Sequence, residues 1–119
     1  YLFFFFLVSN PLFWMETQFL SEQRISELNR IFPFWKELRH EFVKSEIIPI
    51  GERPSGYSFT GFLIKGNRNF MVIFREDTIK VSFDFGVTDF TILATNSEVS
   101  LNNNEIALKD KNSYALLEI

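Results

Sequence analysis

The sequence predicts a single α+β domain in which two N-terminal helices pack on a mainly antiparallel β-sheet meander. Three observations lead to this prediction. The length of 119 residues fits one domain. Apolar residues recur at helical spacing within residues 15–45, and they alternate or run continuously within residues 57–119, as in strands. The 16 phenylalanines provide ample apolar surface for one core that both parts share.

Residues 1–14 form an apolar N-terminal segment. Its run of eight apolar residues is shorter than the roughly 20 that cross a bilayer. No basic residue precedes the run and no clear small-x-small site follows it, so it differs from a signal peptide. We expect the segment to dock on the core. A signal remnant, or an upstream extension that ends before Met15, stays open.

The helical part, residues 15–45, is expected to hold two helices separated by Pro33. Ser21 is a good N-cap for a helix over residues 22–32. Residues 34–44 repeat apolar side chains at helical spacing and predict a second helix. Because proline ends a helix or occupies its first turn, Pro33 marks the boundary between the two.

A connection rich in proline and glycine follows at residues 49–56, and we expect a loop there. The sheet part begins with predicted strands over residues 57–65 and 70–75, joined as a hairpin by the turn at residues 66–69. The second of these strands is apolar on both faces, which predicts a central position in the sheet.

Residues 78–84 alternate between apolar and polar, so we expect a strand with Ile79, Val81 and Phe83 facing inward. Residues 102–104, three asparagines, predict a turn. The remaining predicted strands, the last two forming a hairpin around residues 110–113, are 88–93, 99–101, 105–109 and 114–119.

No catalytic residue, cofactor site or metal site is predicted. The chain has no cysteine and one histidine, His40, which excludes thiolate zinc sites and paired imidazoles. Asp84-Phe85-Gly86 matches the magnesium-binding tripeptide of protein kinases, but the rest of the kinase signature is missing. Glu37 and Glu41 lie one helical turn apart and could bridge a cation, but neighbouring basic residues favour a solvated charged face.

The charge of the chain is unevenly distributed. Residues 1–75 contain nine Lys/Arg and seven Asp/Glu. Residues 76–119 contain three Lys/Arg and eight Asp/Glu, so this part alone has a net charge of −5. Nucleic-acid binders show the opposite sign, so we expect a basic protein partner, and neither nucleic acid nor membrane. The acidic residues proposed to contact this partner are Glu76, Asp77, Asp84, Asp89 and Glu98.

This profile resembles that of bacterial immunity proteins, including the immunity partners of contact-dependent growth inhibition toxins. The shared features are small size, acidic charge, lack of cysteine and an α+β pattern without a catalytic set; no specific motif is shared. The resemblance implies a cytoplasmic, non-catalytic protein that neutralises a toxin, such as a nuclease, by direct binding. Two alternatives stay open: a small ribonuclease-like toxin that uses His40 with Arg68 or Arg75, and a structural or ligand-binding homodimer subunit.

Overall fold

The computed structural model describes residues 21–119. The apolar segment of residues 1–14, and its expected docking on the core, lie outside the described residues. The described part forms one helix and eight strands: α2 (Glu22–Lys44), β1 (Glu46–Gly51), β2 (Phe59–Lys65), β3 (Asn69–Arg75), β4 (Ser82–Phe83), β5 (Thr91–Thr95), β6 (Val99–Asn102), β7 (Glu105–Leu108) and β8 (Ser113–Glu118).

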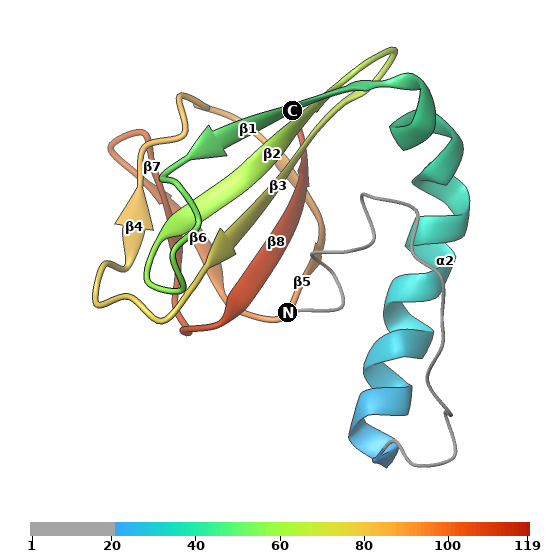
Figure 1. The fold of residues 1–119 in the computed structure, drawn as a ribbon, viewed down its shortest axis with the longest axis horizontal. Coiled ribbons are helices and arrows are strands. Elements are labelled where there is room, and N and C mark those ends of the chain that lie inside the picture. The colour runs from blue at the N-terminus through green and yellow to red at the C-terminus, as the bar shows by residue number, and fades with distance from the viewer. Residues whose placement is uncertain (1–20) are drawn as a thin grey trace.

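The strands form two antiparallel sheets. The large sheet has five strands in the order β1-β2-β3-β8-β5, and the small sheet has three in the order β4-β7-β6. The second half of helix α2 packs on one face of the large sheet, and the small sheet covers the other face (Figure 1). The predicted class, helix plus antiparallel sheet, is confirmed. The meander prediction holds only for β1 to β3, because β8 lies between β3 and β5.

The two predicted helices are one continuous helix in the structure, with Pro33 inside it. Proline removes one hydrogen bond and crowds the preceding turn, at a cost of about 3 kcal/mol. The apolar positions on both sides of Pro33 nevertheless stay in helical phase, and the Phe32 and Trp35 rings meet edge-to-face at 6.2 Å across it. Ser21 caps the helix as predicted, since its side chain accepts the Arg24 N–H at 3.3 Å.

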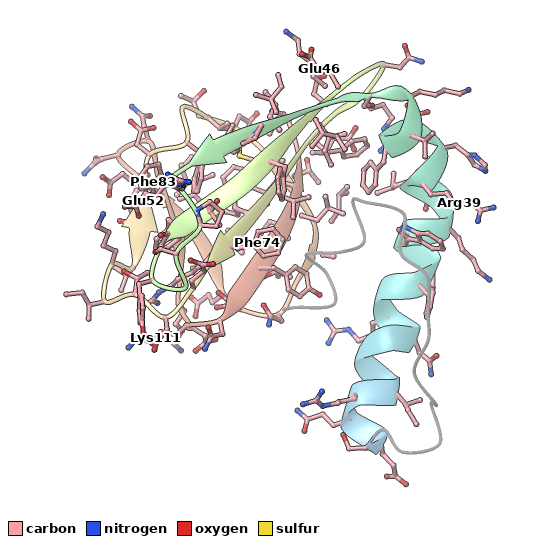
Figure 2. All side chains as sticks on the ribbon, viewed as in Figure 1. Arg39, Glu46, Glu52, Phe74, Phe83 and Lys111 are labelled. Carbon is pink, nitrogen blue, oxygen red and sulfur yellow. The ribbon has the colours of Figure 1, made fainter. Side chains whose placement is uncertain are left out.

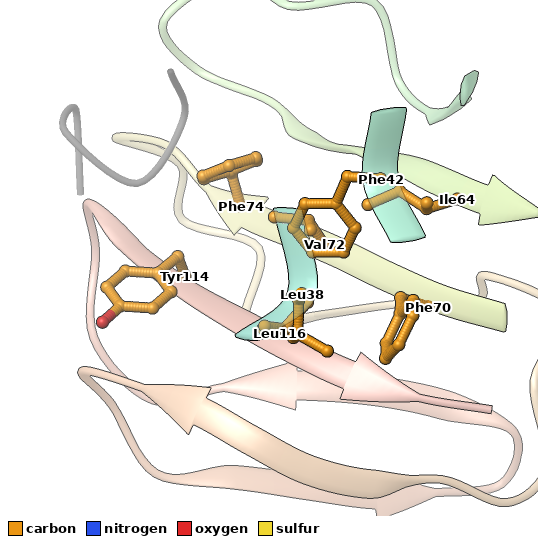
Figure 3. Packing of buried hydrophobic residues seen from close by; sticks show 8 residues of the cluster. All are labelled: Leu38, Phe42, Ile64, Phe70, Val72, Phe74, Tyr114 and Leu116. Carbon is orange, nitrogen blue, oxygen red and sulfur yellow. The ribbon is translucent and has the colours of Figure 1, made fainter. Parts of the chain in front are cut away.

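Only the second half of α2 packs on the sheet. Leu38 and Phe42 are buried there, whereas the beginning of the helix is exposed and extends beyond the sheet (Figure 1). These two side chains meet residues of β2, β3 and β8, forming a cluster that we call the helix-side core (Figure 3): Leu38, Phe42, Ile64, Phe70, Val72, Phe74, Tyr114 and Leu116.

A second cluster, the sheet-side core, fills the space between the two sheets. Strand β3 contributes to both cores in alternation, because Phe70 and Val72 face the helix while Met71 and Ile73 face the small sheet. The predicted central, doubly buried strand is therefore confirmed. The sheet-side core contains Phe59, Met71, Ile73, Ile106, Leu108, Ala115 and Leu117.

Strand β1 occupies residues that were predicted to be partly loop. It lies at the edge of the large sheet, and Pro49 pairs in register with Phe62 of β2. An edge strand tolerates proline because one side of its backbone has no strand to bond. Proline therefore marked an edge strand here rather than a loop.

The prediction for residues 78–84 is largely wrong. Only Ser82–Phe83 forms a strand, and Ile79 and Val81 are 91 % and 56 % exposed instead of inward. Phe83 is half-buried against the sheet-side core, as expected. The reason is local: Thr78 donates its N–H to the Glu76 carbonyl and accepts the Lys80 N–H on its hydroxyl, which turns the backbone before β4.

The predicted hairpin at residues 110–113 is also wrong, because β7 belongs to the small sheet and β8 to the large one. The connection between them passes from one sheet to the other. The turn at residues 102–104 is confirmed: Asn103 and Asn104, with φ of 50° and 70°, join β6 to β7. Two successive positive φ values are typical of a type I′ hairpin turn, which asparagine tolerates.

Candidate protein-binding surface

Three connections meet at the end of the two sheets that lies away from α2. The first joins β1 to β2 (residues 52–58), the second joins β3 to β4 (residues 76–81), and the third joins β7 to β8 (residues 109–112). The Asp77 N–H donates to the Gly56 carbonyl at 3.1 Å, which joins the first connection to the second. Lys111 pairs with the Asp77 carboxylate at 3.1 Å, which adds the third. Figure 2 shows Glu52, Phe83 and Lys111 at this end of the molecule. We call it the loop end and define it as residues 52–58, 76–81 and 109–112.

Glu76 fixes the first of these connections. One carboxylate oxygen, Oε2, accepts backbone N–H groups from Ser55 at 3.3 Å, Gly56 at 2.8 Å and Ser58 at 3.0 Å. Hydrogen bonds to a charged acceptor are stronger than neutral ones. Glu76 is buried. Of the five acidic residues proposed for partner contact, Glu76 is thus the one whose carboxylate binds the backbone of the loop end.

Arg75 fixes the second connection. Its buried guanidinium donates to the carbonyls of Leu108 at 2.8 Å, Lys109 at 2.7 Å and Thr78 at 2.9 Å. These bonds tie the end of β3 to the end of β7 and to the turn that precedes β4. Within the described residues the Arg75 Nε has no hydrogen-bond partner. The three hydrogen bonds that the guanidinium donates explain how a charged side chain can be buried at this position.

The loop end exposes three large apolar side chains. Ile79 is 91 % exposed, Tyr57 71 % and Val81 56 %, and we call these three the loop-end patch. Tyr57 lies between Gly56 and Ser58, whose carbonyls accept the N–H groups of residues 77 and 76, so its connection runs beside the one that carries Ile79. Burying an isoleucine is worth roughly 1.5–3 kcal/mol, so a firmly held, exposed patch favours contact with a partner.

Charged side chains around the patch are largely paired. Lys80 contacts Glu52 at 3.0 Å, and Lys111 contacts Asp77 at 3.1 Å. The pKa of the Glu52 carboxyl is lowered, mainly because the Phe59 N–H donates a hydrogen bond to it and secondly because Lys80 does the same. Arg53, the residue after Glu52, is also exposed. An apolar centre with a polar rim is the usual composition of a protein–protein interface.

The other proposed acidic residues lie on separate connections. Asp77 belongs to the loop end. Asp84 follows β4 and accepts the Gly86 N–H at 2.8 Å, and Asp89 is exposed before β5. Glu98 precedes β6 and lies 3.8 Å from Lys109. Asp84 therefore does not lie on a regular strand, and only Asp77 of the five combines exposure with a place at the loop end.

The residues considered for catalysis or metal binding are also separated. His40 is exposed on α2. Arg68 is bound bidentately by Glu118, with contacts of 2.7 and 2.9 Å, and its guanidinium lies 4.9 Å from the Phe70 ring centre. Arg75 is occupied as described above. Among residues 21–119, no group of three or more His, Cys, Asp or Glu side chains could hold a metal ion.

The loop-end patch could not be predicted from the sequence pattern, because alternation of apolar and polar residues placed Ile79 and Val81 in the core. The available signal was Asp77-Thr78, two residues whose side chains bond readily to nearby backbone and favour turns. Comparison with protein-family models, curated proteins and solved structures finds no match for this chain. None of the helices in the described part is both long and apolar enough to cross a membrane.

Proposed function

We propose that this chain is a non-catalytic protein-binding domain and that it contacts its partner with the loop end. The observation that carries the proposal is Ile79, a large apolar side chain that is 91 % exposed on a backbone held by hydrogen bonds. Interface energy is usually concentrated in a few central apolar or aromatic side chains surrounded by polar residues. Ile79 and Tyr57 would be such centres, with Val81 beside them.

The rigidity of the loop end supports the same proposal. A backbone that is already fixed in the free protein loses less conformational entropy on binding. Hydrogen bonds from the backbone to Glu76 fix residues 55–58, and a hydrogen bond from Arg75 fixes residue 78. The backbone is therefore fixed close to Tyr57 and close to Ile79. The paired charges Lys80–Glu52 and Lys111–Asp77 leave little net charge at this rim. We therefore expect apolar contact to dominate the affinity.

The experiment has two stages. Proteins retained by the immobilised chain from cells of its source are identified, and each is then purified and tested with the purified chain by calorimetry. Ile79→Ser is compared with Val43→Ser, a matched control that removes an apolar side chain 73 % exposed on α2. Ile79→Ser is expected to weaken binding at least tenfold, or about 1.4 kcal/mol, while Val43→Ser binds as the unaltered chain does.

Equal affinity of the Ile79→Ser and unaltered chains would place the contact elsewhere. Both substitutions replace exposed side chains, so they should change the free energy of unfolding by less than about 0.5 kcal/mol. Circular dichroism melting curves of the two variants check this. A loss of affinity in both variants would mean that the effect is not specific to the loop end.

A narrower proposal is that the partner is a toxin and that this chain is its bacterial immunity protein. Its support is the profile of a small chain without cysteine and with net charge −3, together with the exposed carboxylates of Asp77, Asp84, Asp89 and Glu98. These could steer the approach of a basic toxin before the loop-end patch makes contact. The test is co-expression with the product of the neighbouring gene: the chain should restore growth, and Ile79→Ser should not.

A further inference from the structure

The edges of the two sheets differ in how they are protected against pairing with another strand. Natural edge strands are blunted by proline, by bulges, by charge or by being very short. Among the described strands, β1 carries Pro49, β5 has a register shift between Ile92 and Ala94, and β4 has only two residues. The fourth edge strand, β6, pairs regularly with β7 and contains neither proline nor a charged residue.

Strand β6 is also open to solvent. Ser100, Leu101 and Asn102 are exposed, and Val99 is half-buried. Its place at the end of the order β4-β7-β6 leaves one side of the strand without a neighbour in the small sheet. A strand of this kind can accept another strand through backbone hydrogen bonds.

The register with β7 shows which side chains of β6 face the core. Val99 is opposite Leu108 and Leu101 is opposite Ile106, and both partners are fully buried in the sheet-side core. Ser100 and Asn102 therefore point to the outer face. Leu101 remains 37 % exposed although it belongs to the inner row, so part of an apolar side chain is left uncovered at the edge.

We propose that two copies of this chain associate through antiparallel pairing of their β6 strands, with Ser100 opposite Ser100 at the two-fold axis. This register places Val99 of each copy opposite Leu101 of the other on the inner face, so apolar side chains cover the exposed part of Leu101. It also places Glu98 opposite Asn102, so no like charges meet. The two small sheets then form one six-stranded sheet.

The alternative register centred on Leu101 is less favourable. It keeps inner residues opposite inner residues, but it places Val99 opposite Asn103, a turn residue with φ of 50°, and so leaves Val99 without an apolar partner across the interface. A register shifted by one residue would place inner side chains opposite outer ones, which a continuous sheet excludes. Four residues in each strand bury less area than a permanent dimer usually does, so we expect association that depends on protein concentration.

The proposal is independent of the loop end, because β6 and the loop-end patch lie on different elements. Sedimentation equilibrium of the purified chain is expected to show a monomer–dimer equilibrium at concentrations up to about 1 mM, the weak end of the usual affinity range. A chain that stays monomeric over the whole range would overturn the proposal.

Charge variants on the outer face test the register. Ser100→Lys and Ser100→Glu each place two like charges directly opposite one another, so each variant alone should be monomeric. An equimolar mixture of the two should dimerise again, because lysine then faces glutamate. Asn102→Lys is the matched control on the same strand and face: it would face Glu98 of the other copy and should keep the dimer. Dimerisation of Ser100→Lys equal to that of the unaltered chain would contradict the pairing.

Single-cysteine variants give a second, independent measurement, since the chain contains no cysteine. Ser100→Cys places two cysteines opposite one another, with Cβ atoms about 4.5–5.5 Å apart and close to disulfide range. It should form a covalent dimer under mild oxidation. In Asn102→Cys the two thiols are four strand positions apart, or about 13 Å, and should not cross-link. Equal cross-linking of the two variants would contradict the proposed register.

Discussion

The guanidinium of Arg75 donates to the Leu108 carbonyl at 2.8 Å and so joins the two sheets at the loop end. Arg75 is the last residue of β3 and Leu108 the last of β7, so the bond links the large sheet directly to the small one. Its bonds to the carbonyls of Lys109 and Thr78 extend the same connection to the two neighbouring loops. One buried side chain therefore positions much of the proposed binding surface.

Replacing Arg75 by methionine should destabilise the fold strongly. The change leaves three carbonyl groups without their donor, and such losses in buried networks cost about 3–5 kcal/mol. Arg68→Met is the matched control, because Arg68 is exposed and its pair with Glu118 should contribute at most about 1 kcal/mol. Urea unfolding of both variants measures the difference. Equal, small losses would show that the Arg75 bonds contribute little.

Two kinds of element could be predicted from the sequence: a strand that is buried on both faces and a turn that is rich in asparagine. The doubly apolar residues 70–74 lie in the central strand β3, and two of the three asparagines, Asn103 and Asn104, form the turn between β6 and β7. A continuous apolar run reports a strand that is buried on both faces, and asparagine reports a turn because it tolerates positive φ angles. The α+β class followed from the same patterns.

The errors arose where distant contacts or local hydrogen bonds outweighed periodicity. Pro33 suggests a break, but α2 continues through it, and the Phe32 and Trp35 rings contact each other across it. Residues 105–109 and 114–119 look like a hairpin because they are adjacent in sequence; only the pairing of β8 with β3 separates them into two sheets. The loop-end patch was missed for a similar reason, since the Thr78 hydroxyl turns the chain and takes Ile79 out of the alternating pattern.

Glu76→Gln should loosen the first connection of the loop end. A neutral amide oxygen accepts backbone N–H groups less strongly than a carboxylate, and we expect a loss of about 1–3 kcal/mol. Hydrogen exchange at the Gly56 and Ser58 amides should accelerate more than exchange at β3 amides. Glu105→Gln is the control, because the Glu105 carboxylate accepts the Ser82 hydroxyl in a solvent-exposed hydrogen bond and does not touch the loop end. Unchanged exchange at Gly56 would show that Glu76 does not hold the loop.

Leu38→Ala should lower the free energy of unfolding more than Trp35→Ala does. Leu38 is 2 % exposed in the helix-side core, and removing a buried leucine costs about 2–5 kcal/mol. Trp35 is half-buried and packs at the border of that core, so its loss should cost less than the usual 3–5 kcal/mol for a buried large aromatic. Calorimetry should show one cooperative transition for each variant. Two transitions would mean that α2 and the sheets unfold independently.

Stability should fall in acid because two exposed or half-exposed carboxylates are held in their charged form. The side-chain bond from Arg68 lowers the pKa of Glu118 below its ordinary value of 4.5, and the Phe59 N–H followed by Lys80 lowers the pKa of Glu52. When the pKa of a group is lower in the folded state, the unfolded chain binds the proton more readily than the folded chain. Each of these two carboxylates therefore contributes its full stabilisation above pH 4.5. That stabilisation disappears as the pH falls through the pKa of the group in the folded state.

The expected result is a urea midpoint that is steady near neutral pH and decreases below the ordinary glutamate range. The double variant Glu52→Gln/Glu118→Gln should show a smaller decrease over the same interval, because both linked groups are gone. Salt should reduce the difference between the variants, since the Arg68–Glu118 and Lys80–Glu52 pairs are solvent-accessible. Glu46→Gln is the control, an exposed residue at the start of β1. An identical acid profile for the double variant and the unaltered chain would assign the acid sensitivity to other groups.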